Sequence, residues 1–398
     1  MPTAVIVDAV RTPIGARHGA LLSWHPVDLT AHVLRALVVR SGADPALLDD
    51  VIVGCVSQVG EQAFNLGRNA ALAAGLPDTV AGVTVDRQCG SSQQAVHFAA
   101  QGVIAGAYDL VVAAGVEHMS RVPMGESVVA AGSLPFRHGA GDPFGSALHA
   151  RYPGLVPQGI AAERLAERHG LTRDALDAYA WESHRRAAAA VDRGRFDRSI
   201  VAISYTTVTA DGSETRGLLD HDEIPRRPRT RDDLAAFAPA YQPGGVVTAG
   251  NSAPVADGAA AVLIASEECA ERFGLPVLAR FRSFAVAGCD PVEMLTAPVP
   301  ATSRSLERAK VRIDEVDVAE VHESFASAAL AWATAVGADP ERTNVNGGAI
   351  ALGHPLGASG ARMLVDLVHE LGRRGGRLGL QTMSEGGGTA NALVVERP

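Results

Sequence analysis

The sequence predicts an α/β protein made of two similar halves, with a long segment inserted between them. Three observations support this. Short apolar runs alternate with helical patterns before residue 119 and after residue 245, as is typical of parallel strands covered by helices on both faces. The chain between these regions is rich in Gly, Pro and His. An offset of 265 residues relates the apolar triplets at 51–53 and 316–318, and the same offset relates Cys89 to His354.

The first half, residues 1–118, carries four apolar runs of strand character and three helical patterns. We predict strands at 4–10, 50–56, 83–85 and 110–115, and helices at 28–39, 63–74 and 95–104. The last strand-to-helix corner contains Cys89. Each helix here would connect two neighbouring strands of one sheet.

The second segment, residues 119–245, has a different character. Residues 122–159 indicate a loop, and helical patterns follow at 163–169 and 173–193. A connection of this length inside a compact domain is usually functional. We expect a lid or a binding platform, with a dimerisation flap as the alternative.

The third segment, residues 246–398, returns to alternating strands and helices. Strands are predicted at 259–265, 277–288, 316–321, 377–381 and 389–395, and helices at 296–309, 325–336 and 361–371. The Gly-rich stretch from Asn344 to Gly360 precedes the last helix. This is the second strand-to-helix corner of chemical interest.

Composition excludes several classes of function. A net charge of −9, without a basic cluster interleaved with aromatic residues, argues against nucleic acid. The uncharged apolar run 324–338 is too short to span a membrane. Four cysteines among 398 residues make no disulfide framework, and no motif has metal-ligand spacing. The missing metal-ligand spacing leads us to expect no metal. The start of the chain leads directly into a strand pattern, so we expect a cytoplasmic protein.

Cys89 is the first candidate for chemistry. It lies in Asp86-Arg87-Gln88-Cys89-Gly90-Ser91, between the apolar alternation at Val83 and Val85 and the helix that follows. Free amides and the dipole at a helix N-terminus favour a thiolate, and a thiolate can attack a carbonyl. We therefore expect Cys89 to be the most reactive thiol of the chain. The alternative is a small buried cysteine without a chemical role.

His354 is the second candidate, in Gly353-His354-Pro355-Leu356-Gly357. The surrounding glycines do not form a phosphate-binding motif. They indicate instead that the backbone passes close to another group, with one imidazole presented among them. A histidine is the usual base for activating a thiol.

Together these two stretches resemble the nucleophile and Gly-His-Pro motifs of the thiolases, which make or cleave 3-oxoacyl-coenzyme A. The resemblance covers essentially the whole chain. It implies the thiolase fold, with duplicated βαβαβαββ halves in five layers, α-β-α-β-α, and an inserted loop domain. It also implies that Cys89 is the nucleophile and His354 its base.

The resemblance assigns two oxyanion holes. The amides of Cys89 and Gly386 would hold the acyl-enzyme oxygen. His354, together with a water on His322, would hold the other thioester oxygen. The third motif usually begins with Asn, whereas this chain has His322-Glu323-Ser324-Phe325; a histidine can make the same hydrogen bond. The alternative is a structural histidine at a strand end.

Ser384 is the main departure from the family pattern. Thiolases usually have Met-Cys-x-Gly-Gly-Gly, whose Cys is the general acid/base, and this chain has Met383-Ser384-Glu385-Gly386. One thiolase branch places the acid/base Cys in the third motif, at the position of Ser324 here. A serine hydroxyl almost never ionises near neutrality, so it is a poor general base. We expect acylation of Cys89 to survive and the carbon–carbon step to be impaired.

Three explanations of Ser384 stay open. It is an introduced replacement that stalls the enzyme, or a natural residue with His322 or Glu385 as the base. The third is that the protein no longer makes carbon–carbon bonds and transfers or hydrolyses acyl groups. A function of another class is a non-catalytic subunit that binds acyl thioesters.

Coenzyme A contacts are implied at Arg226, near the nucleotide end, and at Ala249, beside the pantetheine. A serine that usually hydrogen-bonds the pantetheine is replaced by Ala253, and a histidine of the loop domain by Pro157. We therefore expect an acyl-coenzyme A substrate and no further cofactor, with acyl carrier protein as an alternative donor. The resemblance also implies a homodimer or homotetramer.

Overall fold

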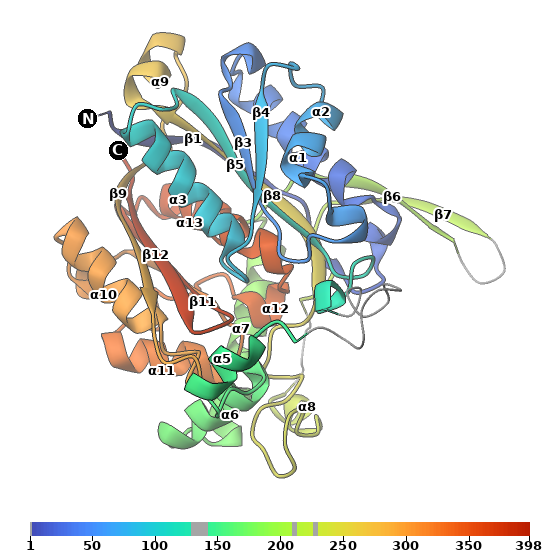
Figure 1. Ribbon diagram of the computed structural model, residues 1–398, viewed down its shortest axis with the longest axis vertical. Helices are drawn as coiled ribbons and strands as arrows, with labels where there is room; N and C mark the ends of the chain where they lie inside the picture. Colours follow the sequence, from blue (N-terminus) through green and yellow to red (C-terminus); the bar gives the residue numbers. More distant parts are fainter. Residues whose placement is uncertain (1, 129–141, 209–212, 226–229) are drawn as a thin grey trace.

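The computed structural model of the protein describes residues 2–128, 142–208, 213–225 and 230–398. Its first repeated unit contains β1 (Ala4–Arg11), α1 (Pro26–Ser41), β3 (Asp50–Gly54), α2 (Leu66–Ala73), β4 (Ala81–Val85), α3 (Ser91–Ile104), β5 (Leu110–His118) and β8 (Ala256–Ser266). The second contains β9 (Ala279–Gly288), α10 (Pro298–Ala309), β10 (Val318–Val321), α11 (Ala326–Val336), α13 (Ser359–Arg374), β11 (Leu378–Glu385) and β12 (Thr389–Glu396). Figure 1 shows both units in sequence colours.

The strands form one mixed sheet in the order β10-β11-β12-β9-β1-β8-β5-β3-β4, with β2 (Gly15–Ala16) beside β8. Outward from the contact between β1 and β9, where Val5 pairs with Arg280 and Ile6 with Ala279, β8, β5 and β3 correspond to β12, β11 and β10. The edge strand β4 has no counterpart in the order. The strand β8 follows the predicted boundary at residue 245, yet it lies between β1 and β5. At this strand the sheet differs from the division predicted from sequence.

The expectation of a parallel sheet is wrong for the middle of the sheet. Among the described strands, β3 runs parallel to β4 and β5, and β10 runs parallel to β11. The pairs that involve β8, β9 and β12 are antiparallel. The turn between β11 and β12 is too short for the crossover that parallel strands require.

The duplication predicted from sequence is confirmed, but its offset is 268 residues rather than 265. Asp50 pairs with Val111 in the first unit, and Val318 pairs with Gly379 in the second, 268 residues later on both strands. The same offset relates Asp49 to Asp317, and each of these carboxylates accepts hydrogen bonds from the amides that begin the neighbouring strand. The position equivalent to Cys89 is therefore Gly357, three residues beyond His354.

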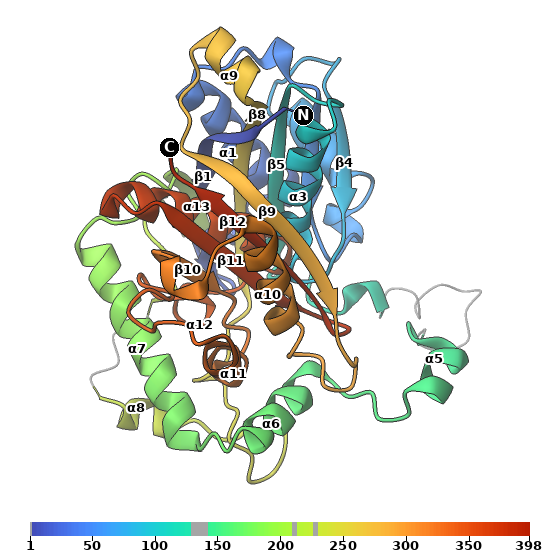
Figure 2. The same cartoon turned by 90° about the vertical axis from the view of Figure 1, so that its left-hand side faces the viewer.

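The helices and sheet make five layers. Helices α1 and α2 pack on one outer face of the first unit's strands. Helices α3 and α13 pack against each other in the middle, between the strands of both units. Helices α10 and α11 cover the outer face of the second unit (Figure 2). The central layer lets the N-termini of α3 and α13 approach one another, which brings the two corners predicted from sequence together.

Small side chains explain the close packing of α3, and a glycine explains where α13 ends. Ala95, Ala99 and Ala100 are fully buried on α3, so this helix can approach its neighbours closely. Helix α13 ends at Gly375, whose φ of 67° is the left-handed conformation that glycine adopts most readily. The result is a rigid support on which both candidate chemical groups are placed.

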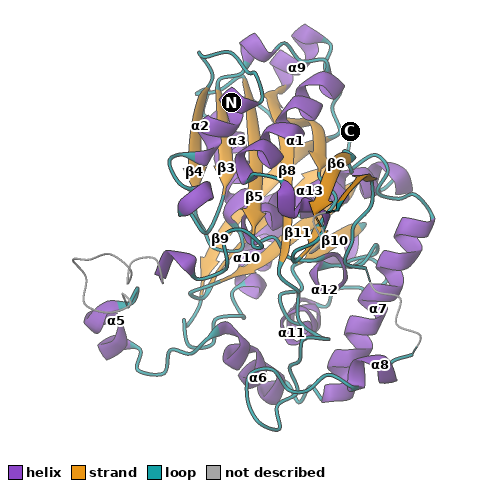
Figure 3. Ribbon diagram, turned by 90° about the vertical axis from the view of Figure 1, so that its right-hand side faces the viewer, coloured by secondary structure: helices purple, strands orange, loops and turns teal. Residues whose placement is uncertain are grey.

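The inserted segment lies mainly beside the second unit, at the end of the molecule away from α9 (Glu267–Phe273) (Figure 3), but its two strands pack against the first unit. It contains α5 (Gly145–Arg151), α6 (Gln158–Arg168), α7 (Arg173–Asp192), β6 (Ile203–Val208), β7 (Glu214–Leu219) and α8 (Asp232–Ala235). The helix α5 falls in a stretch predicted to be loop, and the β6–β7 hairpin has no counterpart in the prediction. Helices α6 and α7 confirm the two helical patterns.

Candidate active site

Cys89 lies at a sharp corner between β4 and α3. Gln88, immediately before it, has a φ of 48°, a conformation that residues other than glycine rarely adopt. The turn is held by Asp86, which accepts a hydrogen bond from the Gln88 amide at 2.6 Å, and by Ser91, which accepts one from the Arg87 amide at 2.9 Å. Backbone strain of this kind is common at functional sites. The turn places the Cys89 thiol between the two repeated units.

Burial controls the ionisation of Cys89. The residue is 7% exposed, and burial, followed by the charge of Glu385, raises the pKa of its thiol to about 12. The amides of Cys89 and Gly386 act in the opposite direction. The thiolate predicted from the helix N-terminus is therefore wrong for the free protein, because burial raises the pKa of the thiol more than the neighbouring amides lower it. The thiol needs a base when it reacts.

His354 has the form that such a base requires. Its Nδ1 lies 2.6 Å from the hydroxyl of Ser359, and this hydroxyl donates its own proton to the Pro355 carbonyl at 2.9 Å. The hydroxyl must then accept from Nδ1–H, which leaves a lone pair on Nε2. That Nε2 is buried and has no hydrogen-bond partner among the described residues. Nε2 of His354 can therefore accept a proton.

The imidazole of His322 lies beside that of His354, with 4.2 Å between the ring centres. Burial, and then the Arg362 guanidinium, lower the pKa of His322 to about 3. Burial also lowers the pKa of His354 well below its usual value, with smaller contributions from His322 and Arg362. Both rings are therefore neutral at physiological pH. Like His354, His322 has a buried Nε2 without a partner in the described part of the chain.

Ser384 and Ser324 occupy one spot beside His322. The hydroxyl of Ser384 lies 3.4 Å from Nδ1 of His322 and 3.1 Å from the hydroxyl of Ser324. These are the two positions at which the family resemblance predicts an acid/base thiol. Although 60 residues separate them in the chain, they meet at a single point in space. A thiol at either one would therefore reach the same region.

The turn between β11 and β12 joins this group to Cys89. Gly386 begins the turn, and a hydrogen bond from its amide lowers the pKa of the Cys89 thiol. Met383, just before Ser384, and Leu356, two residues after His354, pack with Cys89 in one apolar cluster. The structure thus brings Cys89, Gly386, His354, His322 and Ser384 into one site.

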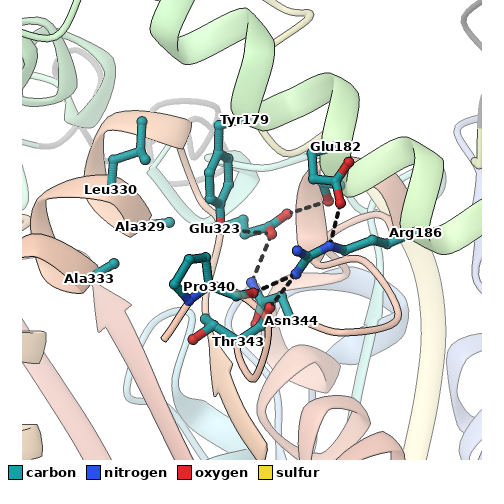
Figure 4. A pocket seen from close by; sticks show the side chains of 11 residues that line it. Tyr179, Glu182, Arg186, Glu323, Ala329, Leu330, Ala333, Pro340, Thr343 and Asn344 are labelled. Carbon is teal, nitrogen blue, oxygen red and sulfur yellow. Dashed lines mark hydrogen bonds and ion pairs between the residues drawn. The ribbon is translucent and has the colours of Figure 1, made fainter. Parts of the chain in front are cut away.

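Glu323 fixes the backbone behind this site. Its carboxylate accepts hydrogen bonds from Tyr179 (3.0 Å), Ser183 (2.8 Å) and Asn344 (2.7 Å), and from the amide of Ile350 (3.2 Å). Figure 4 shows Tyr179 and Asn344 pointing at this carboxylate from opposite sides of a small pocket. Glu323 therefore links His322, the Gly-rich stretch and helix α7 of the inserted segment.

The predicted coenzyme A contacts are only partly placed. The amide of Ala253 donates to the Ser324 carbonyl at 3.0 Å, so this residue lies next to the site. Ala249 is exposed, four residues earlier on the same segment. The segment then reaches His354, whose amide donates to the Pro254 carbonyl at 3.0 Å. Arg226 lies outside the described residues.

Ser359 and Glu323 are functional candidates that the sequence motifs did not predict. Ser359 stands five residues after His354, and only the turn that begins α13 brings its hydroxyl back to the imidazole. A polar residue at the start of a helix was the available signal. For Glu323, the signal was a carboxylate inside an otherwise uncharged run.

Two absences hold for the part of the chain that the structure describes. No group of three or more His, Cys, Asp or Glu residues is arranged to bind a metal ion there. Likewise, none of its helices is long and apolar enough to cross a membrane.

A buried thiol, a neutral imidazole and paired amides at the meeting point of two α/β units are the features of an acyltransferase with a cysteine nucleophile. Comparison with known proteins identifies the family. The model described as "Thiolase, N-terminal domain" matches residues 4–268, and the model described as "Thiolase, C-terminal domain" matches residues 275–397. The chain belongs to the thiolase family.

Individual relatives resemble the chain over its whole length. The steroid 3-ketoacyl-CoA thiolase FadA6 of Mycobacterium tuberculosis is 43% identical over 397 residues, covering 100% of this chain and 95% of the relative. A 3-ketoacyl-CoA thiolase of Aliivibrio fischeri is 41% identical, with 100% of both chains covered. The crystal structure of the Bacillus anthracis acetyl-CoA acetyltransferase superimposes with a TM-score of 0.89 at 39% identity, covering 100% of this chain and 99% of that one.

Proposed function

We propose that the protein transfers acyl groups between coenzyme A thioesters through a thioester on Cys89, and that Ser384 limits the carbon–carbon step. The substrate class is acyl-coenzyme A and 3-oxoacyl-coenzyme A, in keeping with the names of the relatives. The observation that carries this proposal is the arrangement of His354, whose Nε2 lone pair is unpartnered among the described residues while its Nδ1 is held by Ser359.

Acylation requires a base for the Cys89 thiol, donors that hold the oxyanion, and a proton for the coenzyme A sulfur as it leaves. The Cys89 thiol gives its proton to Nε2 of His354, and the sulfur attacks the thioester carbonyl. The amides of Cys89 and Gly386 face the position of the sulfur and can hold the oxyanion. The coenzyme A sulfur then leaves and takes the proton from His354. Nothing in this half-reaction needs a group at residue 384.

Carbon–carbon bond formation needs a further base to take a proton from the α-carbon of the second thioester. Ser384 is ill-suited because its hydroxyl ionises far above neutral pH. His322 is a weak base because its pKa is lowered to about 3. Glu385 follows Ser384 on β11, and successive strand side chains point to opposite faces. This alternation argues against Glu385 as a replacement for the missing thiol.

Coenzyme A exchange and thiolysis, measured on the purified chain, test the proposal. Exchange of labelled coenzyme A into acyl-coenzyme A uses only acylation and its reversal, so it should be readily measured. Thiolysis of a 3-oxoacyl-coenzyme A also needs proton transfer at carbon, so it should be slower than exchange by about 10²- to 10⁴-fold. Failure to exchange would contradict the proposal and favour a non-catalytic, thioester-binding subunit. Thiolysis as fast as exchange would contradict the role given to Ser384.

We also propose that the chain assembles at least as a dimer through the edge of β4. This strand ends the sheet, and an exposed strand edge can pair with a second copy. Val83 on β4 is 40% exposed. Phe64 is 94% exposed, and the next residue, Asn65, donates a hydrogen bond to the Gly82 carbonyl of β4 at 2.9 Å. Exposed apolar residues that cluster at a sheet edge are typical of an interface.

Light scattering at micromolar concentration should therefore give at least the mass of two chains. Val83→Glu should shift the protein towards the monomer because it places a charge in the contact. Phe273→Glu on α9 is the matched control: this residue is also exposed, but it lies elsewhere on the surface. A wild-type monomer, or equal dissociation of both variants, would contradict the proposed interface.

A further inference from the structure

Glu385 is a buried carboxyl directly behind the nucleophile, and the acylation mechanism above does not use it. It is the last residue of β11 and is fully buried. Its Oε2 accepts a hydrogen bond from the Thr389 hydroxyl at 2.7 Å. Its Oε1 lies against Gly90, where a methyl group would overlap with it, and has no hydrogen-bond partner among the described residues. The carboxyl therefore contacts the residue that follows Cys89.

No close ion pair among the described residues neutralises this carboxyl. From the turn after β4, the Arg87 guanidinium lowers the pKa of Glu385 and the Asp86 carboxyl raises it, and both effects are smaller than that of burial. Thr389, on β12, lowers it by its hydrogen bond. The balance raises the pKa of Glu385 to about 7.

The surroundings of Glu385 hold further polar atoms without partners in the described chain. On α3 these atoms are Oε1 of Gln94 and both ring nitrogens of His97. The others are Nε of Arg87 and, on β12, Oδ1 of Asn391. The carbonyl of Gly90 accepts hydrogen bonds from the backbone amide of Gln94 and from the side-chain nitrogen of Asn391. Burial, followed by the charge of Arg87, lowers the pKa of His97 to about 3, so this ring contributes no charge near neutrality.

The charge on Glu385 acts on Cys89. After burial, it is the largest cause of the raised pKa of the Cys89 thiol, and Glu117, on β5, adds a smaller effect of the same sign. A carboxylate beside a developing thiolate opposes its formation, because two negative charges meet in a site with little water. A neutral carboxyl removes this penalty without changing the shape of the site.

We propose that Glu385 sets the reactivity of Cys89, such that the nucleophile is activated while the carboxyl is protonated and is suppressed when the carboxyl ionises. Glu385 acts through Cys89 and is a positioning residue rather than a catalytic one. The inference rests on the proposed role of Cys89 as the nucleophile. Alkylation of Cys89 tests it directly, without thiolase turnover.

The sign of the pH effect follows from the two charge states. At low pH, Glu385 is neutral in the wild-type chain, which then behaves like Glu385→Gln. Above its pKa of about 7, the wild-type carboxyl is charged and the Cys89 thiolate is disfavoured. The ratio of Cys89 alkylation rates, Glu385→Gln over wild type, should therefore rise from near one at about pH 5.5 to about tenfold at about pH 9, because only the charged carboxyl opposes the thiolate.

The measurement is iodoacetamide labelling of Cys89, quantified by peptide mapping across this pH range. Thr389→Val should move the midpoint of the rise to higher pH, because it removes a hydrogen bond that favours the charged carboxyl. Glu271→Gln, an exposed carboxyl on α9, is the control and should match wild type. A ratio that does not change with pH would overturn the inference and leave Cys89 as the nucleophile. Wild-type labelling that spares Cys89 would overturn both assignments.

Discussion

Ser384→Cys should raise the rate of thiolysis by about 10²- to 10⁴-fold, the usual effect of a well-placed general acid/base. The thiol would stand beside His322, where the Ser384 hydroxyl now lies 3.4 Å from Nδ1. Thiols ionise near pH 8.5, far below a hydroxyl, so a thiol here can donate the proton that the departing α-carbon takes up in thiolysis. Steady-state thiolysis of a 3-oxoacyl-coenzyme A measures the change. Coenzyme A exchange in the same variant should change little, because it does not use this group.

Two further variants separate the thiol from the space that it fills. Ser384→Ala should retain the low wild-type rate, since the hydroxyl does not act as a base. Ser324→Cys should give a partial gain, because the two hydroxyls are 3.1 Å apart. If Ser384→Cys leaves thiolysis unchanged, another residue carries the proton and the account of this site is wrong.

His354→Gln should slow acylation of Cys89 by about 10²- to 10⁴-fold, because the buried thiol loses its proton acceptor. With its pKa raised to about 12, Cys89 holds almost no thiolate in the free protein. Rapid quenching after mixing with acyl-coenzyme A, followed by mass spectrometry of the protein, gives the rate. The effect should persist at saturating substrate, since His354 acts on the chemical step.

Ser359→Ala is the matched variant for this prediction. It keeps the imidazole but removes the hydroxyl 2.6 Å from Nδ1, so the ring loses the partner that fixes its proton. Loss of an orienting partner typically costs about 10- to 100-fold, so this variant should lie between wild type and His354→Gln. Equal rates in wild type and His354→Gln would contradict the role of His354 as the base.

The sequence predicted the elements well where their hydrophobic pattern is strong. The run at 4–10 became β1, and the patterns at 95–104 and 361–371 became α3 and α13, the helices that carry both corners of the site. The direction of the strands in the middle of the sheet could not be predicted. A buried strand has the same apolar run whether its neighbours are parallel or antiparallel.

The duplication was detectable from sequence, but its exact register was not. Apolar triplets are common, so the match of Val51 with Val316 suggested an offset three residues too short. The offset of 268 depends on strand pairing and on the equivalent carboxylates of Asp49 and Asp317. These hydrogen bonds join positions about 60 residues apart, and a single sequence gives no sign of them.

Within the site, residue types were predictable and electrostatics were not. Cys89, His354 and His322 were identified by motif, and the structure brings the two imidazoles within 4.2 Å. The raised pKa of Cys89 was missed because a helix N-terminus favours the thiolate, whereas burial opposes it. How deeply a residue is buried depends on the packing of both units, which local sequence does not encode.

We expect Cys89 to take up an acyl group that Ser384 cannot help to transfer to carbon. Intact-mass spectrometry of the wild-type chain after incubation with acetyl-coenzyme A, with Cys89→Ala beside it, tests this most directly. A mass increase of one acetyl group should persist in the wild-type chain and be absent from Cys89→Ala. The absence of any adduct on the wild-type chain, or an equal adduct on Cys89→Ala, would contradict it.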